Sequence, residues 1–404
     1  MHKKVGMWGL MGCAVFLLLV LGIKSVWYFS FQSPQDKVVA TVFIHGTVGA
    51  PFNVINPYKS FTDKAYPSSS CARFISRFRN QEIMKCDQVL GDEGLHSVDY
   101  KKLPKMHAAH YIIGAYDDIA RFSNPHRIYE YAIFGWSGFL SHTARLSDAE
   151  KLYDDLCKYR DQLHQKYNTW PVIHIVAHSH GGNVALLLEY WEQQKQRGLK
   201  VEVLCMYGTP MQHETKLHMQ SPFFEKIVMA FSQGDKVQCI DYISTTHRKS
   251  YARMRDLGEC AGHSKPDTYV RMDAQLFANG NTCGITHSNM WLARQAQSVV
   301  PVMGSLPFVV VTPLFIDRVF GNVPDECAWH LHQSDKQVAA FCTPHKNIEK
   351  NIMLTCTTFD QRQLYALLKK WSHLMKREWE EDFGSRRLIF NSKNFIALKN
   401  ALWQ

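Results

Sequence analysis

The sequence predicts an α/β fold, a mostly parallel sheet flanked by helices. Of its 404 residues, 46% are hydrophobic and 20% are charged, which is enough for a large buried core and excludes a disordered chain. Strand-like and helix-like patterns alternate from residue 37 to about residue 300, as is typical of parallel sheets. Residues 171–191 read as an apolar strand that runs through a sharp turn into an apolar helix. These observations favour one α/β domain over residues 37–300.

Short runs rich in β-branched or other apolar residues predict the strands of this sheet. They are residues 37–44, 128–134, 172–177, 201–207, 227–231 and 269–277. Helices are expected between them at residues 147–167 and 182–194. In the first helix, apolar side chains recur at the spacing that one helix face requires, at Leu152, Leu156, Tyr159 and Leu163.

Two regions depart from this alternation. Residues 51–124 are rich in Pro, Ser and Gly, and we interpret them as a loop-rich insertion over the sheet edge. Residues 301–404 are interpreted as a C-terminal extension with one clear helix, whose apolar positions are Leu364, Leu368, Trp371 and Met375. Lysines and arginines lie among these positions. They indicate either a packed helix with a solvated basic face or contact with a membrane surface.

The N-terminus has the pattern of a membrane anchor. Residues 5–23 contain no charge, follow Lys3 and Lys4, and precede Lys24 and an aromatic cluster. About 20 apolar residues span a bilayer as a helix, so residues 1–32 are predicted to be a transmembrane anchor. A cleaved signal peptide is the alternative, although no small-x-small cleavage site follows Ile23. The positive start predicts a single-pass membrane protein with the bulk of the chain on the exported side.

Charge and cysteine content agree with an exported, membrane-bound chain. The formal net charge of +10 favours anionic surfaces such as lipid headgroups, and no motif indicates nucleic-acid binding. Cys157 and Cys205 fall in a helix and a strand pattern and are expected to be free core thiols. Disulfides are expected among the eight cysteines in loop-like stretches, with their pairing left open. These are Cys71, Cys86, Cys239, Cys260, Cys283, Cys327, Cys342 and Cys356.

The most informative motif is Ala177-His178-Ser179-His180-Gly181, placed between the predicted strand and helix. A nucleophile elbow presents its serine in this strand-turn-helix context. The turn is so sharp that larger side chains two positions before and after the serine would collide with their surroundings, and Ala177 and Gly181 are small. The Ser179 hydroxyl would then lie near the N-terminus of the following helix, where the helix dipole favours negative charge.

With Gly182, these residues resemble the α/β-hydrolase superfamily, in the variant in which Ala replaces the first glycine of the elbow. The chain is similar to bacterial lipases with an AHSxGG elbow, to serine esterases and to the GPI inositol-deacylase group, over roughly residues 37–300. The resemblance implies that Ser179 is the nucleophile. It also implies an oxyanion hole formed by the backbone N–H groups of Thr47 and His180, because His45-Gly46 follows the first strand as in such lipases.

Chain order in this superfamily is serine, acid, histidine. Asp235 follows the predicted strand at 227–231 and is expected to orient the base, with Asp241 as the nearby alternative. His287 follows the strand at 269–277 and is the preferred general base. His263 is the alternative base, but it precedes that strand.

No metal or organic cofactor is expected. His174, His178 and His180 lie close in sequence, but the elbow breaks the strand alternation and no carboxylate or cysteine completes a ligand set. His213 and His218 are one residue too far apart for an HExxH zinc motif. Phosphate-binding loops of the GxxxxGK or GxGxxG type are not found in the sequence.

The sequence therefore predicts a membrane-anchored serine hydrolase that cleaves carboxylic esters, of lipid or acyl type, through an acyl-enzyme. Two alternatives remain open: an acyltransferase or amidase with the same triad, and an inactive hydrolase fold that acts as a binding protein. The identity of the ester and the oligomeric state are not determined by the sequence.

Overall fold

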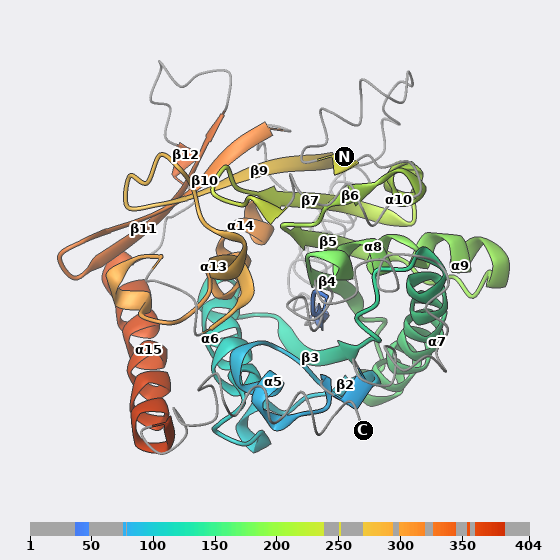
Figure 1. The fold of residues 1–404 in the computed structure, drawn as a ribbon, viewed down its shortest axis with the longest axis horizontal. Coiled ribbons are helices and arrows are strands. Elements are labelled where there is room, and N and C mark those ends of the chain that lie inside the picture. Colours follow the sequence, from blue (N-terminus) through green and yellow to red (C-terminus); the bar gives the residue numbers. More distant parts are fainter. Residues whose placement is uncertain are drawn as a thin grey trace, which may run out of the picture.

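A ten-stranded mixed sheet forms the centre of the fold (Figure 1). The computed structural model describes residues 37–47, 76–77, 79–237, 250–251, 270–293, 299–319, 326–344, 354–355 and 360–383. The strands of the large sheet are β1 (Val38–Ile44), β2 (Gly94–Ser97), β3 (Ile128–Gly135), β4 (Val172–His178), β5 (Val201–Tyr207), β7 (Phe224–Phe231), β9 (Val270–Ala278), β10 (Glu326–Ser334), β11 (Gln337–Pro344) and β12 (Leu354–Thr355). Their order is β12-β11-β10-β9-β7-β5-β4-β1-β3-β2.

The predicted α/β fold is confirmed. Neighbouring strands from β3 across to β10 are parallel, and antiparallel strands occupy only the margins, β2 at one side and β11 with β12 at the other. Two further strands, β6 (Met211–Gln212) and β8 (Ser250–Tyr251), pair antiparallel in a separate small sheet. Each predicted strand is present, with ends shifted by at most three residues.

Helices cover both faces of the sheet, and each face has its own apolar core. Helices α6 (Ala108–Ser123), α13 (His287–Trp291), α14 (Thr312–Val319) and α15 (Gln361–Phe383) pack on one face. Helices α7 (His142–Tyr167), α8 (His180–Leu186) and α9 (Leu188–Lys195) pack on the other. Alternate side chains of a strand point to opposite faces, so Phe43 and Val176 join the first core while Val42 and Ile175 join the second.

The register of the central strands aligns their carboxyl ends. Ile44 of β1 pairs with Ala177 of β4, His178 of β4 with Tyr207 of β5, and Tyr207 with Ala230 of β7. The segments that follow these strands therefore meet at one edge of the sheet, where open α/β sheets bind their ligands.

The region predicted as a loop-rich insertion, residues 51–124, contains a core helix. The prediction is wrong for α6, whose apolar residues are largely buried against the sheet and against α15. The helix contains Gly114, where a Cβ would lie 2.2 Å from the Trp371 ring. The glycine is needed for close helix packing. Residues 51–75 of the predicted insertion lie outside the described residues.

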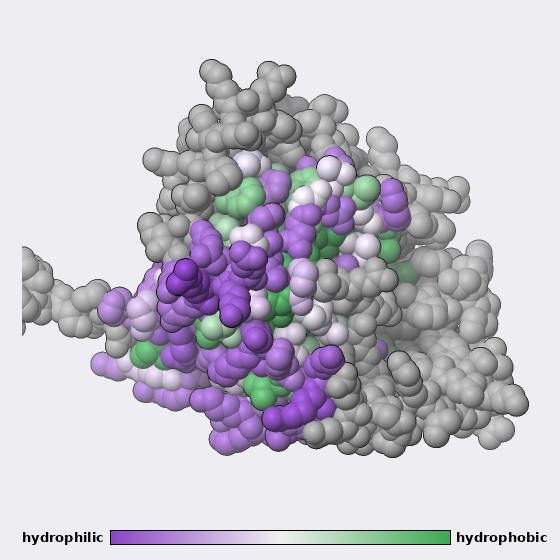
Figure 2. All heavy atoms as spheres, turned by 90° about the vertical axis from the view of Figure 1, so that its left-hand side faces the viewer, coloured by the Kyte–Doolittle hydropathy of each residue, from purple (hydrophilic) through white to green (hydrophobic). Residues whose placement is uncertain are grey.

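Residues 301–404 hold more than the single helix expected from the sequence. The predicted helix is present as α15, with Leu364, Leu368, Trp371 and Met375 buried as expected. Strands β10 and β11 are additional, and β10 extends the sheet by pairing in parallel with β9. Their turn was not recognised because Asp335 adopts a positive φ of 47° without a glycine. Figure 2 shows that the described surface on the α15 side is largely hydrophilic.

The predicted N-terminal anchor, residues 1–32, lies outside the described residues. In the part of the chain that the structure describes, none of the helices combines the length and apolarity needed to span a bilayer. Cys157 and Cys205 are buried free thiols, as predicted. Cys283 and Cys327, expected to join disulfides, are also free thiols in the part of the chain that the structure describes. Cys283 is exposed in a turn, and Cys327 is buried in β10.

Candidate active site

The predicted sharp turn is present at Ser179, between the last residue of β4 and the first residue of α8. Ser179 has φ 51° and ψ −131°, a conformation that side chains rarely adopt. Two hydrogen bonds hold the turn: the Ser179 N–H donates to the Tyr207 carbonyl at 2.8 Å, and the Gly182 N–H donates to the Ser179 carbonyl at 3.0 Å. Strain of this kind typically costs about 1–3 kcal/mol and persists where the surroundings enforce it, often at functional sites.

Glycines surround this turn because the backbone segments approach closely. A Cβ at position 181 would lie 2.4 Å from the carbonyl oxygen of His45. A Cβ at position 46 would lie 2.9 Å from the Ser179 Cβ. The end of β1 is thus packed directly against the serine, which explains why small residues are required on both sides of the contact.

Asp235 and His287 are brought together from separate loops. Asp235 follows β7, and His287 is the first residue of α13. The His287 Nδ1 lies 2.8 Å from Asp235 Oδ2, and the other carboxylate oxygen accepts the N–H of Val237 at 2.9 Å. The Asp235 side chain is fully buried and that of His287 is 17% exposed. An ionised carboxylate only accepts, so Nδ1 carries the proton and Nε2 is the basic nitrogen.

Gly208 links this pair to the serine turn. It follows β5 with φ +58°, and a Cβ here would lie 2.8 Å from both Asp235 Oδ2 and His287 Nδ1. The preceding residue, Tyr207, is the one whose carbonyl accepts the Ser179 N–H. One dipeptide at the end of β5 therefore contacts both the serine turn and the histidine–aspartate pair. This role could not be read from the sequence, in which Gly208 is only a glycine that follows a predicted strand.

His45 fixes the loop that carries Thr47. Its Nδ1 donates to the Gly46 carbonyl at 2.6 Å, its Nε2 accepts the Trp136 N–H at 3.3 Å, and the Trp136 indole donates to the His45 carbonyl at 2.8 Å. Burial, with a smaller contribution from Arg79, lowers the pKa of His45 to about 3, so the ring is neutral at physiological pH. Thr47 follows with a buried hydroxyl. His180, the other predicted oxyanion residue, begins α8.

The sequence offers one alternative base and one alternative acid. His263 and Asp241 both lie outside the described residues. The structure brings His287 to Asp235, which is the pair preferred from the sequence.

The histidines near the elbow contact different partners. His174 lies 2.7 Å from Glu202, whereas His178 stacks on Trp291. In the described ranges, the structure shows no group of three or more His, Cys, Asp or Glu side chains arranged to hold a metal ion.

Comparisons with known proteins give no family. No family model and no curated protein matches the chain. One similar solved structure is a hyperthermophilic esterase from the archaeon Pyrobaculum calidifontis, with 10% identity, 83% of this chain and 77% of that chain covered, and a TM-score of 0.27. Another is an uncharacterized protein from Pseudomonas aeruginosa, with 13% identity, 74% and 48% covered, and a TM-score of 0.26. This chain thus spans about half of the Pseudomonas protein. At these scores the likeness carries no functional conclusion, so the function is argued from the site.

Proposed function

We propose that the chain is a serine hydrolase of carboxylic esters, with Ser179 as nucleophile, His287 as general base and Asp235 as the residue that orients the base. The observation that carries this proposal is the 2.8 Å bond between His287 and the buried Asp235, held through Gly208 beside the strained turn of Ser179.

In the first step, Nε2 of His287 takes the proton of the Ser179 hydroxyl while the serine oxygen attacks the ester carbonyl. The imidazolium then returns this proton to the departing alcohol, which leaves an acyl group on Ser179. Water attacks the acyl-enzyme with His287 again as base, and the acid is released. Asp235 stabilises the imidazolium in both steps, because its buried carboxylate accepts the proton on Nδ1.

The oxyanion of each tetrahedral intermediate would be bound by the backbone N–H groups of His180 and Thr47. His180 begins α8, where N–H groups point out of the helix end, and Thr47 follows the glycine packed on Ser179. Loss of one such donor typically lowers the rate by about 10²–10³-fold.

We further propose that the ester is a lipid or other acyl ester, and that residues 5–23 anchor the domain on the exported side of a membrane. The apolar N-terminal sequence and the basic net charge support this location. An acyltransferase or amidase would use the same residues with another acceptor or leaving group, and product analysis with an added alcohol separates these reactions.

Labelling with a fluorophosphonate probe tests the proposal, because only an activated serine reacts. Ser137→Ala is a matched control, since Ser137 also follows a strand but bonds to Asp148 at 2.5 Å. We expect the parent and Ser137→Ala to be labelled, and Ser179→Ala to remain folded by circular dichroism, unlabelled and at least ~10³-fold slower on an acyl ester. Folded parent protein that is not labelled, or equal activity in Ser179→Ala, would favour a binding protein.

A further inference from the structure

His178 lies immediately before Ser179 and contacts the helix that carries the base. Its ring is stacked on Trp291 with centroids 5.3 Å apart and planes 6° apart, and its centroid lies 4.5 Å from that of His287. His287 and Trp291 are the first and last residues of α13. The residue beside the nucleophile therefore touches both ends of the helix that holds the base.

The His178 ring also lies close to the end of β1. A Cβ at Gly46 would lie 2.8 Å from His178 Nδ1 and 2.9 Å from the Ser179 Cβ. The side chain is 5% exposed, and its Nε2 is buried with no hydrogen-bond partner among the described residues. The side chain thus contacts α13 in two ways, through the stacking of its ring on Trp291 and through a hydrogen bond with the backbone of His287.

Helix α13 needs such support because it is only five residues long. Helices of this length are not stable on their own, so their position depends on tertiary packing. The cap at Thr286, which accepts the Asn289 N–H at 3.3 Å, fixes the start of the helix but not its distance from Ser179.

The surroundings of His178 favour the neutral form of its ring. Burial, followed by the proximity of His287, lowers the pKa of His178 well below its usual value, and His45 and His180 lower it further. During the proposed reaction His287 becomes an imidazolium. A neutral neighbour 4.5 Å away does not repel that charge, whereas a charged one would.

We propose that His178 is a positioning residue, whose ring, stacked on Trp291 and bonded to the His287 backbone, sets the position of the His287 imidazole relative to Ser179. This inference rests on the proposed function. A displacement of the base by about 1 Å can lower the rate by about 10²-fold.

The test compares His178→Leu with His178→Phe, two apolar replacements of similar size of which only phenylalanine retains a planar ring. We expect His178→Leu to lower kcat and the rate of fluorophosphonate labelling by ~10–100-fold with little change in KM. His178→Phe keeps the planar ring but loses the hydrogen bond to the His287 backbone, so its loss should be at least about threefold smaller than that of His178→Leu. Circular dichroism and thermal unfolding check that both variants fold.

A second measurement does not require activity. The proton shared by His287 Nδ1 and Asp235 should give a downfield NMR signal, identified by its loss in Asp235→Asn. We expect this signal to be broadened or shifted in His178→Leu and retained in His178→Phe. An unlabelled parent would contradict the proposed function, while the NMR comparison would still decide the inference. Unchanged labelling and an unchanged signal in His178→Leu, or equal losses in both variants, would overturn the role of the ring.

Discussion

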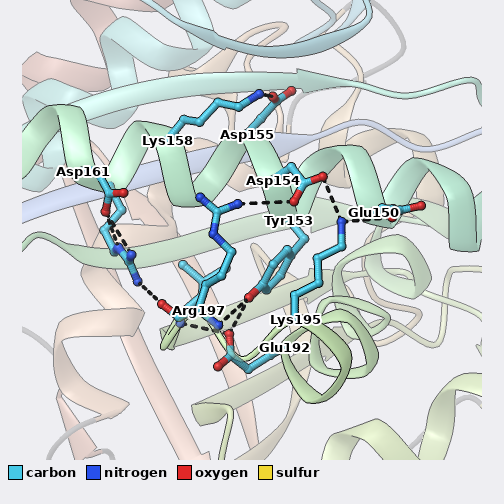
Figure 3. A network of polar contacts seen from close by, with 11 residues as sticks. Glu150, Tyr153, Asp154, Asp155, Lys158, Asp161, Glu192, Lys195 and Arg197 are labelled. Carbon is cyan, nitrogen blue, oxygen red and sulfur yellow. Dashed lines mark hydrogen bonds and ion pairs between the residues drawn. The ribbon is translucent and has the colours of Figure 1, made fainter.

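The charge network between α7 and α9 and the candidate active site are both rich in polar side chains, but they differ in burial. Between α7 and α9, Asp154 binds Lys195 at 2.9 Å and Arg197 at 3.3 Å, within a larger network of charges (Figure 3). These three side chains are 26–38% exposed. At the candidate active site, by contrast, Asp235 has no exposed side-chain surface and binds His287. Exposed ion pairs are screened and contribute little, so the number of charges does not mark a functional site.

Backbone geometry separates the two regions as well. In the α7–α9 network, the Glu192 carboxylate accepts the N–H groups of Gly198 and Leu199 at 2.9 and 3.0 Å, which fastens the turn before β5. Gly198 has φ +69°, but nothing lies within 4 Å of a Cβ built on it. Gly208 also has a positive φ, yet the space beside it is filled by the histidine–aspartate pair. Crowding at a glycine, together with burial and strain, distinguishes the site.

The largest expected effect comes from removing the charge of the buried acid. Asp235→Asn should lower kcat by ~10³–10⁴-fold, because an amide no longer selects the Nδ1-protonated form of His287 or stabilises the imidazolium. Steady-state hydrolysis of an acyl ester measures this loss. Asp154→Asn in the α7–α9 network is the matched control and should keep full activity. A loss below tenfold in Asp235→Asn would contradict the assigned role.

An intermediate effect is expected from the two glycines with positive φ. Gly198→Ala should lower the free energy of unfolding by about 1–2 kcal/mol through left-handed strain. Gly208→Ala should lower it by at least as much, because its Cβ also clashes with buried side chains. Only Gly208→Ala should also slow ester hydrolysis, by about 10²-fold, because its Cβ displaces the His287–Asp235 pair. Urea unfolding and kcat, measured on the same samples, separate the effect on stability from the effect on catalysis. Equal activity in both variants would show that the contact at Gly208 is not functional.

The smallest effect is expected within the α7–α9 network. The Tyr153 hydroxyl donates to Glu192 at 2.8 Å and accepts the Arg197 N–H at 3.2 Å. Tyr153→Phe should lower the free energy of unfolding by about 1 kcal/mol, the usual contribution of such hydrogen bonds, and leave activity unchanged. Urea unfolding gives the first quantity and ester hydrolysis the second. A tenfold loss of activity would mean that this network supports the site, and the contrast between the two regions would fail.

Much of this architecture could be predicted because it follows from local patterns. The central strands are short apolar runs buried on both faces of the sheet. The turn at Ser179 is predicted by small residues between a strand pattern and a helix pattern. Asp235 and His287 are predicted from the order serine, acid, histidine that the resemblance implies. The structure brings the two residues together.

The contacts of Gly208 and His178 could not be predicted because they join loops that are distant in the sequence. The same holds for α6, where Gly114 allows the close approach of Trp371, a residue that is distant in the sequence. Residues 326–344 escaped prediction for a different reason. Their hairpin turns at Asp335 without glycine, and β10 includes His330 and His332 within its strand pattern.

The proposed nucleophile, acid and base follow three different strands, β4, β7 and β9, and the acid and base are 52 residues apart. Bringing such distant loops together costs chain entropy that is recovered only when the intervening strands have paired. A nascent chain that has emerged only as far as β7 holds the serine but not its base. For the proposed hydrolase, the reactive arrangement can therefore form only after the chain has been synthesised beyond β9 and residue 287.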